Sequence, residues 1–250
     1  MKKFLMIIPL LLCLFACEFP ARKPETANTG GIPENINTVT VNFFNESSFR
    51  AAVYMNVNPS SSDTSAPPIA LVSAGTTEKV QLPPSADQSI GDVFYIRYYV
   101  QLADSFTSGT GEPIYAQAQR DISNIAFVLK KGETYTKTIS QPASGQLKFL
   151  NGYIKVQNTG TKSFQVLQGS TYLKKLGNNE LNLASGKFGF YELNVSSLEN
   201  TETISSLKLF VTDSANTIAV EPFLLERGKI YGFECNGTSV TAPAVTSITY

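Results

Sequence analysis

The sequence predicts an all-β protein made of two tandem antiparallel β-sandwich domains of immunoglobulin-like type, related by an internal repeat. Apolar residues alternate with polar ones in short segments, no window holds a helical apolar stripe with caps, and one series of segments occurs twice. About six short strands per ~105 residues, separated by Gly, Pro, Asn and Ser turns, are typical of a sandwich. A single large barrel would also give alternating strands, but it would not explain the repeat.

The first expected element is a cleaved signal peptide over residues 1–16. Lys2 and Lys3 give it a positive start, and an apolar stretch follows from Phe4 to Phe15, interrupted only by Pro9. This stretch is too short to cross a bilayer of ~30 Å, which needs about 20 residues. The charged start and the polar sequel favour a signal peptide over a buried N-terminal helix.

The stretch Leu14-Phe15-Ala16-Cys17 resembles the lipobox of bacterial lipoproteins. In that family, signal peptidase II cuts before the cysteine, whose thiol carries diacylglycerol and whose new amine is usually acylated, for example with palmitate. Phe15 is bulkier than the usual residue, a looseness familiar in spirochaete lipoproteins. The resemblance implies a lipid anchor at Cys17 and a place in the cell envelope, at the outer membrane or cell surface rather than the cytoplasmic membrane. An ordinary secretory signal is the alternative.

A flexible tether is expected to follow the lipidated cysteine, so that residues 17–37 link the membrane to the folded part. The segment is polar, rich in Pro, Gly and Asn, and without periodicity. The square-root scaling of flexible linkers gives it a reach of roughly 25 Å.

Strands are expected wherever the alternation of apolar and polar residues holds. Clear examples are Val39 to Phe43, Phe94 to Val100 and Leu207 to Val211. We expect a first sandwich over residues 38–149 and a second over residues 150–250. Domains of this size bury about 65% of their chain surface, which is enough for a core without disulfides.

The internal repeat pairs four stretches of the first domain with four of the second. The pairs are Val41–Asn45 with Ile154–Asn158, Leu71–Gly75 with Asn182–Gly186, Phe94–Ile96 with Leu207–Leu209, and Phe127–Ile139 with Phe223–Cys235. Each copy then closes on a strand-like tail, at residues 146–150 and 245–250. Gly132 and Gly228 lie between two apolar runs in the last pair, and we expect each to supply the positive φ of a tight hairpin turn.

The repeat also predicts the role of Cys235, which takes the position of Ile139 in the other copy. Cys13 leaves with the signal peptide and Cys17 carries lipid, so Cys235 has no disulfide partner. Nothing nearby in sequence provides the electropositive, exposed site of a reactive thiol. We expect Cys235 to behave as a small core hydrophobe.

The composition argues against several classes of function. Net charge is zero and charged residues make up 16%, so no basic field attracts nucleic acid. The chain has no His, the commonest general base and metal ligand. Ser205 and Lys208 match the S-x-x-K spacing of penicillin-recognising enzymes, but they open a predicted strand, where such positions point to opposite faces. We expect no enzyme, no cofactor and no metal site.

Two surfaces of the first domain are candidates for binding. Its copy of the repeat is longer around residues 58–68 and 104–115, and loops at the ends of a sandwich are common recognition surfaces, although insertions also drift freely. In the strand from Phe94, the alternate residues form an outward stripe of aromatic and Arg side chains, types enriched at binding sites. That face could instead pack on the other domain or on a loop. The candidate binding residues are Tyr95, Arg97, Tyr99, Phe106 and Tyr115.

Together these features predict a membrane-anchored cell-envelope lipoprotein that acts as a non-catalytic binding or assembly module, with contacts through the first domain's loops. Expected partners are the membrane, through Cys17, and an envelope protein, a polysaccharide or a host component. The alternative is a structural or accessory subunit of a surface fibre that donates its apolar terminal segment, residues 245–250, to a neighbour. An enzyme is the least favoured class.

Overall fold

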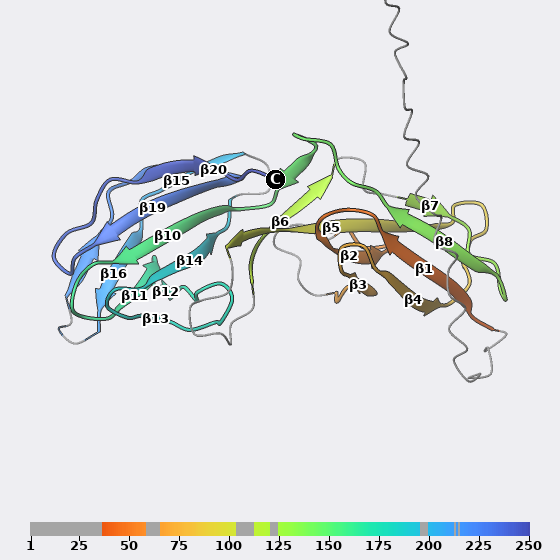
Figure 1. Ribbon diagram of the computed structural model, residues 1–250, viewed down its shortest axis with the longest axis horizontal. Helices are drawn as coiled ribbons and strands as arrows, with labels where there is room; N and C mark the ends of the chain where they lie inside the picture. Colours follow the sequence, from red (N-terminus) through yellow and green to blue (C-terminus); the bar gives the residue numbers. More distant parts are fainter. Residues whose placement is uncertain are drawn as a thin grey trace, which may run out of the picture. The chain divides into compact units, whose positions relative to one another are not determined.

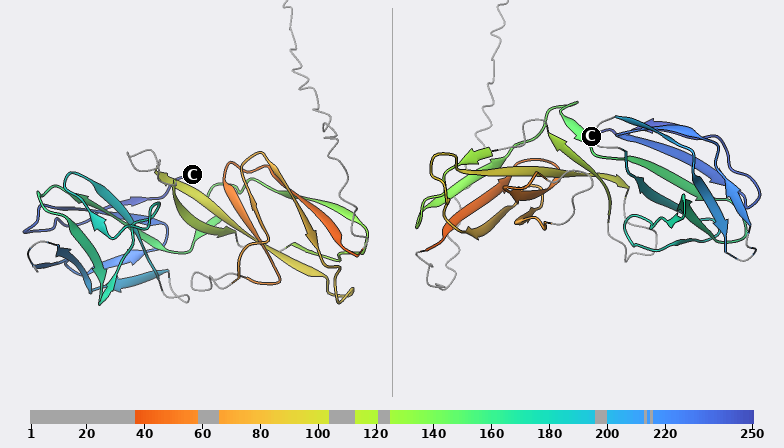
Figure 2. Two further views of the ribbon diagram at one scale, coloured as in Figure 1. Left: turned by 90° about the horizontal axis from the view of Figure 1, so that it is seen from below. Right: turned by 180° about the vertical axis from the view of Figure 1, so that it is seen from behind.

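The computed structural model describes residues 37–58, 66–103, 113–120, 125–195, 200–212, 214 and 216–250, which fall within one compact unit. The expected signal peptide, Cys17, almost all of the tether and Phe106 lie outside the described residues. Within them, the chain folds into strands and no helix, in two repeats of similar topology (Figures 1 and 2). The predicted all-β fold with tandem β-sandwich repeats is confirmed. None of the described segments is a helix that could span a membrane.

The first repeat consists of two facing sheets. The smaller sheet has the order β4-β1-β8, and the larger has the order β3-β2-β5-β6-β9, with β7 also paired to β5. Their bounds are β1 (Val39–Asn45), β2 (Arg50–Met55), β3 (Ala70–Val72), β4 (Thr77–Leu82), β5 (Asp92–Ala103), β6 (Ile114–Arg120), β7 (Ile125–Phe127), β8 (Thr134–Ile139) and β9 (Leu147–Phe149).

The second repeat follows the same plan. One sheet has the order β14-β10-β19-β20, the opposing sheet has the order β12-β11-β16-β17 with β13 on β11, and β15 pairs with β18. Their bounds are β10 (Gly152–Asn158), β11 (Phe164–Gln168), β12 (Thr171–Tyr172), β13 (Asn182–Leu183), β14 (Phe188–Leu193), β15 (Thr201–Ile204), β16 (Leu207–Val211), β17 (Thr217–Ala219), β18 (Phe223–Glu226), β19 (Lys229–Cys235) and β20 (Ala244–Ser247).

The strand registers match between the repeats. Most strand pairs are antiparallel, but β1 pairs in parallel with β8, and β10 pairs in parallel with β19 (Figure 1). In the first parallel pair Asn45 lies opposite Ile139, and in the second Asn158 lies opposite Cys235. The predicted equivalence of Ile139 and Cys235 is therefore confirmed by the pairing.

A buried asparagine fixes the end of the first strand in each repeat. The side-chain amide of Asn45 donates hydrogen bonds to the carbonyl oxygens of Phe49, at 2.7 Å, and Val72, at 2.9 Å. Its side-chain oxygen accepts a hydrogen bond from the backbone N–H of Ser47, at 3.0 Å. One side chain thereby joins the end of β1 to the residue before β2 and to β3, and it satisfies three buried backbone groups.

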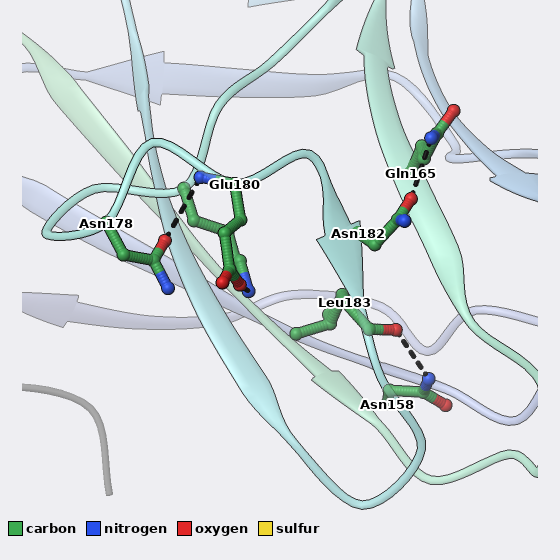
Figure 3. A network of polar contacts seen from close by, with 7 residues as sticks. Asn158, Gln165, Asn178, Glu180, Asn182 and Leu183 are labelled. Atoms are coloured by element: carbon green, nitrogen blue, oxygen red, sulfur yellow. Dashed lines mark hydrogen bonds and ion pairs between the residues drawn. The ribbon is translucent and has the colours of Figure 1, made fainter. Parts of the chain in front are cut away.

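Asn158 repeats this arrangement in the second repeat. Its amide donates to the carbonyl oxygens of Lys162, at 2.8 Å, and Leu183, at 3.0 Å, and its oxygen accepts from the backbone N–H of Gly160, at 2.9 Å. Figure 3 shows the contact from Asn158 to Leu183 on β13. The sequence repeat thus conserves polar contacts as well as apolar positions.

The turns at Gly132 and Gly228 have the expected conformation but a different role. Their φ angles are 75° and 73°. However, β7 pairs with β5 while β8 pairs with β1, and β18 pairs with β15 while β19 pairs with β10. The hairpin prediction is wrong, because each turn carries the chain from one sheet to another.

A tyrosine braces each of these corners. The hydroxyl of Tyr135 accepts a hydrogen bond from the backbone N–H of Lys130, at 3.1 Å. The hydroxyl of Tyr231 accepts one from the backbone N–H of Glu226, at 3.0 Å. In each case the tyrosine of the strand that follows the turn accepts a hydrogen bond from the backbone just before the turn. The repeated spacing of Gly and Tyr in the sequence gives both corners this contact.

Each repeat has its own apolar core. Val39, Val41 and Phe43 lie in the first core with Ile139, whereas Cys235, fully buried, lies in the second. Burial raises the pKa of the Cys235 thiol. The expectation that Cys235 fills a core position is confirmed.

The junction between the repeats involves residues of both. Tyr153 is a residue of β10 in the second sandwich, yet its side chain packs with the core of the first. The proposed boundary between residues 149 and 150 stays a prediction. Both expected closing tails contain a strand: β9 pairs with β6, and β20 pairs with β19.

Candidate binding site

Three candidate residues of β5 lie on the larger sheet of the first repeat, on the face turned away from its core. Phe94, Ile96 and Tyr98 of β5 are buried in that core. Because successive strand residues point to opposite faces, Tyr95, Arg97 and Tyr99 share the other face. The expected division of β5 into a core face and an aromatic stripe is therefore present.

Arg97, however, does not face solvent. Only 5% of it is exposed, its Nη1 atom donates a hydrogen bond to Oε1 of Gln117 at 2.8 Å, and its guanidinium lies over the Tyr54 ring, 5.5 Å from the centroid. The expectation that Arg97 belongs to an exposed stripe is wrong. The reason is that neighbouring strands and the second repeat supply groups that cover it.

Residues of the second repeat reach this part of the face. The hydroxyl of Tyr153 accepts a hydrogen bond from the backbone N–H of Gln117, at 3.0 Å, and the side chain of Asn151 donates one to Glu192. Burial raises the pKa of the Glu192 carboxyl, while the hydrogen bond from Asn151 and the charge of Arg97 oppose that rise. The alternative foreseen from the sequence, packing of this face on the other domain, holds here.

Burial and the nearby Glu192 charge also raise the pKa of Tyr153. Tyr153 therefore stays neutral and serves as a hydrogen-bonding group of the junction. A polar cluster at the junction therefore consists of the buried Arg97 and Tyr153 and the half-buried Gln117 and Glu192.

Two of the other candidates, Tyr99 and Tyr115, line a common cleft of 440 Å³. They come from the adjacent strands β5 and β6, and their rings meet edge to face with centroids 6.1 Å apart. Burial and a hydrogen bond with Tyr54 raise the pKa of Tyr99. Tyr95 is half-buried opposite Tyr54 and does not line this cleft.

The cleft also contains residues that the sequence did not single out. Phe49, a residue of the first core, immediately precedes β2, Arg50 is the first residue of β2, and Tyr250 comes from the end of the sequence. The Tyr250 ring packs on Phe49 with centroids 5.8 Å apart, and its hydroxyl accepts a hydrogen bond from the backbone N–H of Leu147 at 3.0 Å. Arg50 lies opposite Tyr99 in the strand register, a neighbour that no sequence pattern reveals.

The longer segments of the first repeat are only partly described. Residues 59–65 and 104–112, including the candidate Phe106, lie outside the described part, so their role stays a prediction. Ile114 and Tyr115 were expected in an inserted loop but begin strand β6 instead. The described part of this extra length therefore extends the β5–β6 ladder, which places Tyr115 beside Tyr99.

Among the described residues, no Asp, Glu or Cys side chain lines the cleft. The described part of the chain also holds no cluster of three or more His, Cys, Asp or Glu residues suited to a metal ion. The cleft combines tyrosine and phenylalanine rings with hydroxyl groups, the Gln101 amide and one guanidinium. This set of groups can contact and orient a ligand through ring faces and hydrogen bonds.

No protein-family model matches the sequence, and no curated protein matches it. Among solved structures, the chain is similar to a proposed cell adhesion protein from Bacteroides ovatus, with 11% identity and a TM-score of 0.32 over 85% of this chain and 98% of that one. It is also similar to a C-terminally truncated form of the tip fimbrial protein Mfa3 from Porphyromonas gingivalis, with 10% identity and a TM-score of 0.29 over 84% of this chain and 99% of that one. Likeness at this level carries no conclusion about function.

Proposed function

We propose that the protein is a lipid-anchored component of the cell envelope whose first repeat acts as a non-catalytic binding module. The observation that carries this proposal is the 440 Å³ cleft lined by Phe49, Tyr99, Tyr115 and Tyr250. Its volume lies within the range of about 300–1,000 Å³ that is usual for small-molecule sites. Aromatic side chains supply rigid contact area at low entropic cost, so a cleft rich in them is suited to recognition.

A binding role also agrees with the chemistry of the cleft. Catalysis requires a general acid, a general base or a nucleophile whose pKa suits the reaction. The ionisable side chains here are those of tyrosines and one arginine, and the pKa of Tyr99 is raised rather than lowered. These groups favour contact and hydrogen bonding over proton transfer near neutral pH.

Binding through the cleft is tested with matched tyrosine variants. The full-length protein, Tyr115→Ala and Tyr172→Ala would be compared for binding to intact envelope fractions and to arrays of saccharides and peptides. Tyr172 is a suitable control because it is exposed on β12, in the second repeat. We expect Tyr115→Ala to weaken binding at least about tenfold and Tyr172→Ala to leave it unchanged. Equal binding by all three proteins would contradict the proposal.

The lipid anchor is proposed from Cys17 and its preceding residues. Each buried methylene contributes about 0.8 kcal/mol, so two or three acyl chains would hold the protein stably on a membrane. Growth with a fatty-acid probe should label the wild type and Cys13→Ala but not Cys17→Ala. Label that persists in Cys17→Ala would refute the anchor. Protease treatment of intact cells then tests whether the protein is at the surface, because only an exposed protein would be lost.

A second candidate function, a structural subunit that joins chains by an added strand, is favoured by one difference between the repeats. In the second repeat β20 covers the outer edge of β19, whereas β8, the equivalent strand, is the edge of its sheet within the described residues. The terminal segment that was expected to be donated thus already pairs within its own chain. Sedimentation of the delipidated protein as a monomer, together with no ladder of oligomers from cells, would exclude this function.

A further inference from the structure

The charge of the cleft identifies a class of ligand. Arg50 is the only charged side chain among the lining residues, and it is exposed at the start of β2. Its guanidinium makes no hydrogen bond or ion pair with another residue of the described ranges. A guanidinium presents a planar set of donors that matches a carboxylate in a bidentate geometry. Arg50 is therefore available for an anionic group of a ligand.

The rings of the cleft lie close to this charge. Arg50 is opposite Tyr99 in the β2–β5 register, and both residues line the cleft. Tyr115 and Tyr250 complete the aromatic wall. A ligand whose own ring packs on these aromatic side chains can therefore place a charged substituent of that ring next to Arg50.

The strand pairing argues against an extended peptide as the ligand. A bound peptide strand needs an unpaired sheet edge for its backbone hydrogen bonds. Strands β5 and β6, which carry Tyr99 and Tyr115, are paired on both sides, with β2 and β9 as their outer neighbours. A nucleic acid is also disfavoured, because the cleft offers one positive charge and the chain has zero net charge.

We propose that the cleft binds a carboxylated saccharide, with a terminal uronic or sialic acid held between Arg50 and the aromatic wall of Tyr99 and Tyr115. The carboxylate pairs with the guanidinium, and the apolar C–H face of the sugar packs on the rings. Ser48, Ser73 and Gln101 supply hydroxyl and amide groups near the sugar hydroxyls. This inference rests on the proposed binding function and adds the chemistry of its ligand.

The test uses saccharides that differ only in the carboxylate. Oligosaccharides ending in glucuronic acid or N-acetylneuraminic acid would be titrated onto the full-length protein beside the same compounds with the carboxylate reduced to a primary alcohol. We expect the acids to bind at least about tenfold more tightly than the alcohols, since hydrogen bonds to charged groups are the stronger ones. Raising the salt concentration should narrow this difference.

Variants separate the charge from the rings. Arg50→Gln should weaken binding of the acid much more than binding of the alcohol, so that the preference for the acid is lost, whereas Tyr115→Ala should weaken both to a similar degree. Lys79→Gln is the matched control, because Lys79 is also an exposed cation on a strand of the first repeat, β4, but lies outside the cleft. Arg50 is exposed, so the substitution should not prevent folding, and an unchanged thermal transition would confirm this.

The remaining outcomes of these experiments distinguish failure of the carboxylate inference from failure of the proposed binding function. Equal affinity for acid and alcohol, or an acid preference that survives Arg50→Gln, overturns the carboxylate inference while the binding function stands. The same holds if no saccharide binds but an envelope protein or peptide binds in a Tyr115-dependent way. If a ligand binds and neither Arg50→Gln nor Tyr115→Ala affects it, the cleft is not the site and both proposals fail.

Discussion

Replacing Asn158 with alanine should strongly destabilise the second repeat. The substitution removes two donated hydrogen bonds, to the carbonyl oxygens of Lys162 and Leu183, and one accepted from Gly160. Each buried polar group left without a partner costs about 1–3 kcal/mol. Three such groups, with some relief from the second lone pairs and from water, give an expected loss of roughly 3–5 kcal/mol. For a domain of ~100 residues this corresponds to a fall in melting temperature of about 15 °C or more.

The assay is urea denaturation of the full-length protein with amide hydrogen exchange to follow each repeat. Exchange should rise for the amides of β10, β11 and β13, while the first repeat keeps its protection. Asn45→Ala should give the reverse, because Asn45 makes the equivalent contacts in the first repeat.

The matched control is Asn182→Ala, in which an exposed asparagine loses its hydrogen bond with Gln165 (Figure 3). Surface changes of this kind usually alter stability by less than about 0.5 kcal/mol. If Asn158→Ala costs no more than Asn182→Ala, the buried asparagine does not hold the strand end, and the proposed structural basis of the repeat is incorrect.

Three further predictions concern the corners, the junction and the thiol. Gly228→Ala should destabilise the protein more than Gly132→Ala. Both glycines have positive φ, a conformation that costs alanine about 1–2 kcal/mol. In addition, a Cβ at Gly228 would lie 2.7 Å from the Phe149 ring, whereas a Cβ at Gly132 would have no atom within 4 Å. Thermal unfolding of the two variants measures this difference. Because the pKa of Glu192 is raised, the folded protein holds the proton of this carboxyl more tightly than the unfolded chain does. The free energy of unfolding should therefore fall as pH rises from 4.5 through the raised pKa. Glu192→Gln should flatten this part of the profile of stability against pH, and an unchanged profile would contradict the prediction. Finally, Cys235 should resist thiol reagents at neutral pH in the native protein and react after denaturation, because it is fully buried and its pKa is raised; rapid native labelling would exclude this.

The parts of the fold that depend on local pattern could be predicted from the sequence. Alternation in β1 and β5 identified strands and their buried faces, because side chains in a strand point to alternate sides regardless of the rest of the fold. Comparison of the two copies placed Cys235 in the core at the position of Ile139. Positive φ at Gly132 and Gly228 was also predictable, since few residues other than glycine adopt it readily.

The partners of these elements could not be predicted in the same way. A glycine turn between two apolar runs suits both a hairpin and a corner between sheets, and only the pairing of β7 and β8 with different strands decides between them. Arg97 looked exposed from alternation, but Gln117 and the second repeat cover its face. Alternation assigns a side chain to a face and says nothing about what packs there.

The sequence by itself therefore determined the strand class, the duplicated plan, the two cores and the aromatic character of the first repeat, because these follow from residue types and their spacing along the chain. Only the tertiary structure decided that Tyr99 and Tyr115 remain available while Arg97 does not, and that Phe49, Arg50 and Tyr250 join them in one cleft. The physical reason is that a binding site is made by long-range contacts. Its residues come from the start of β2 and the turn before it, the turn after β3, strands β5 and β6, and the terminal segment, and they meet only when the sheets have assembled.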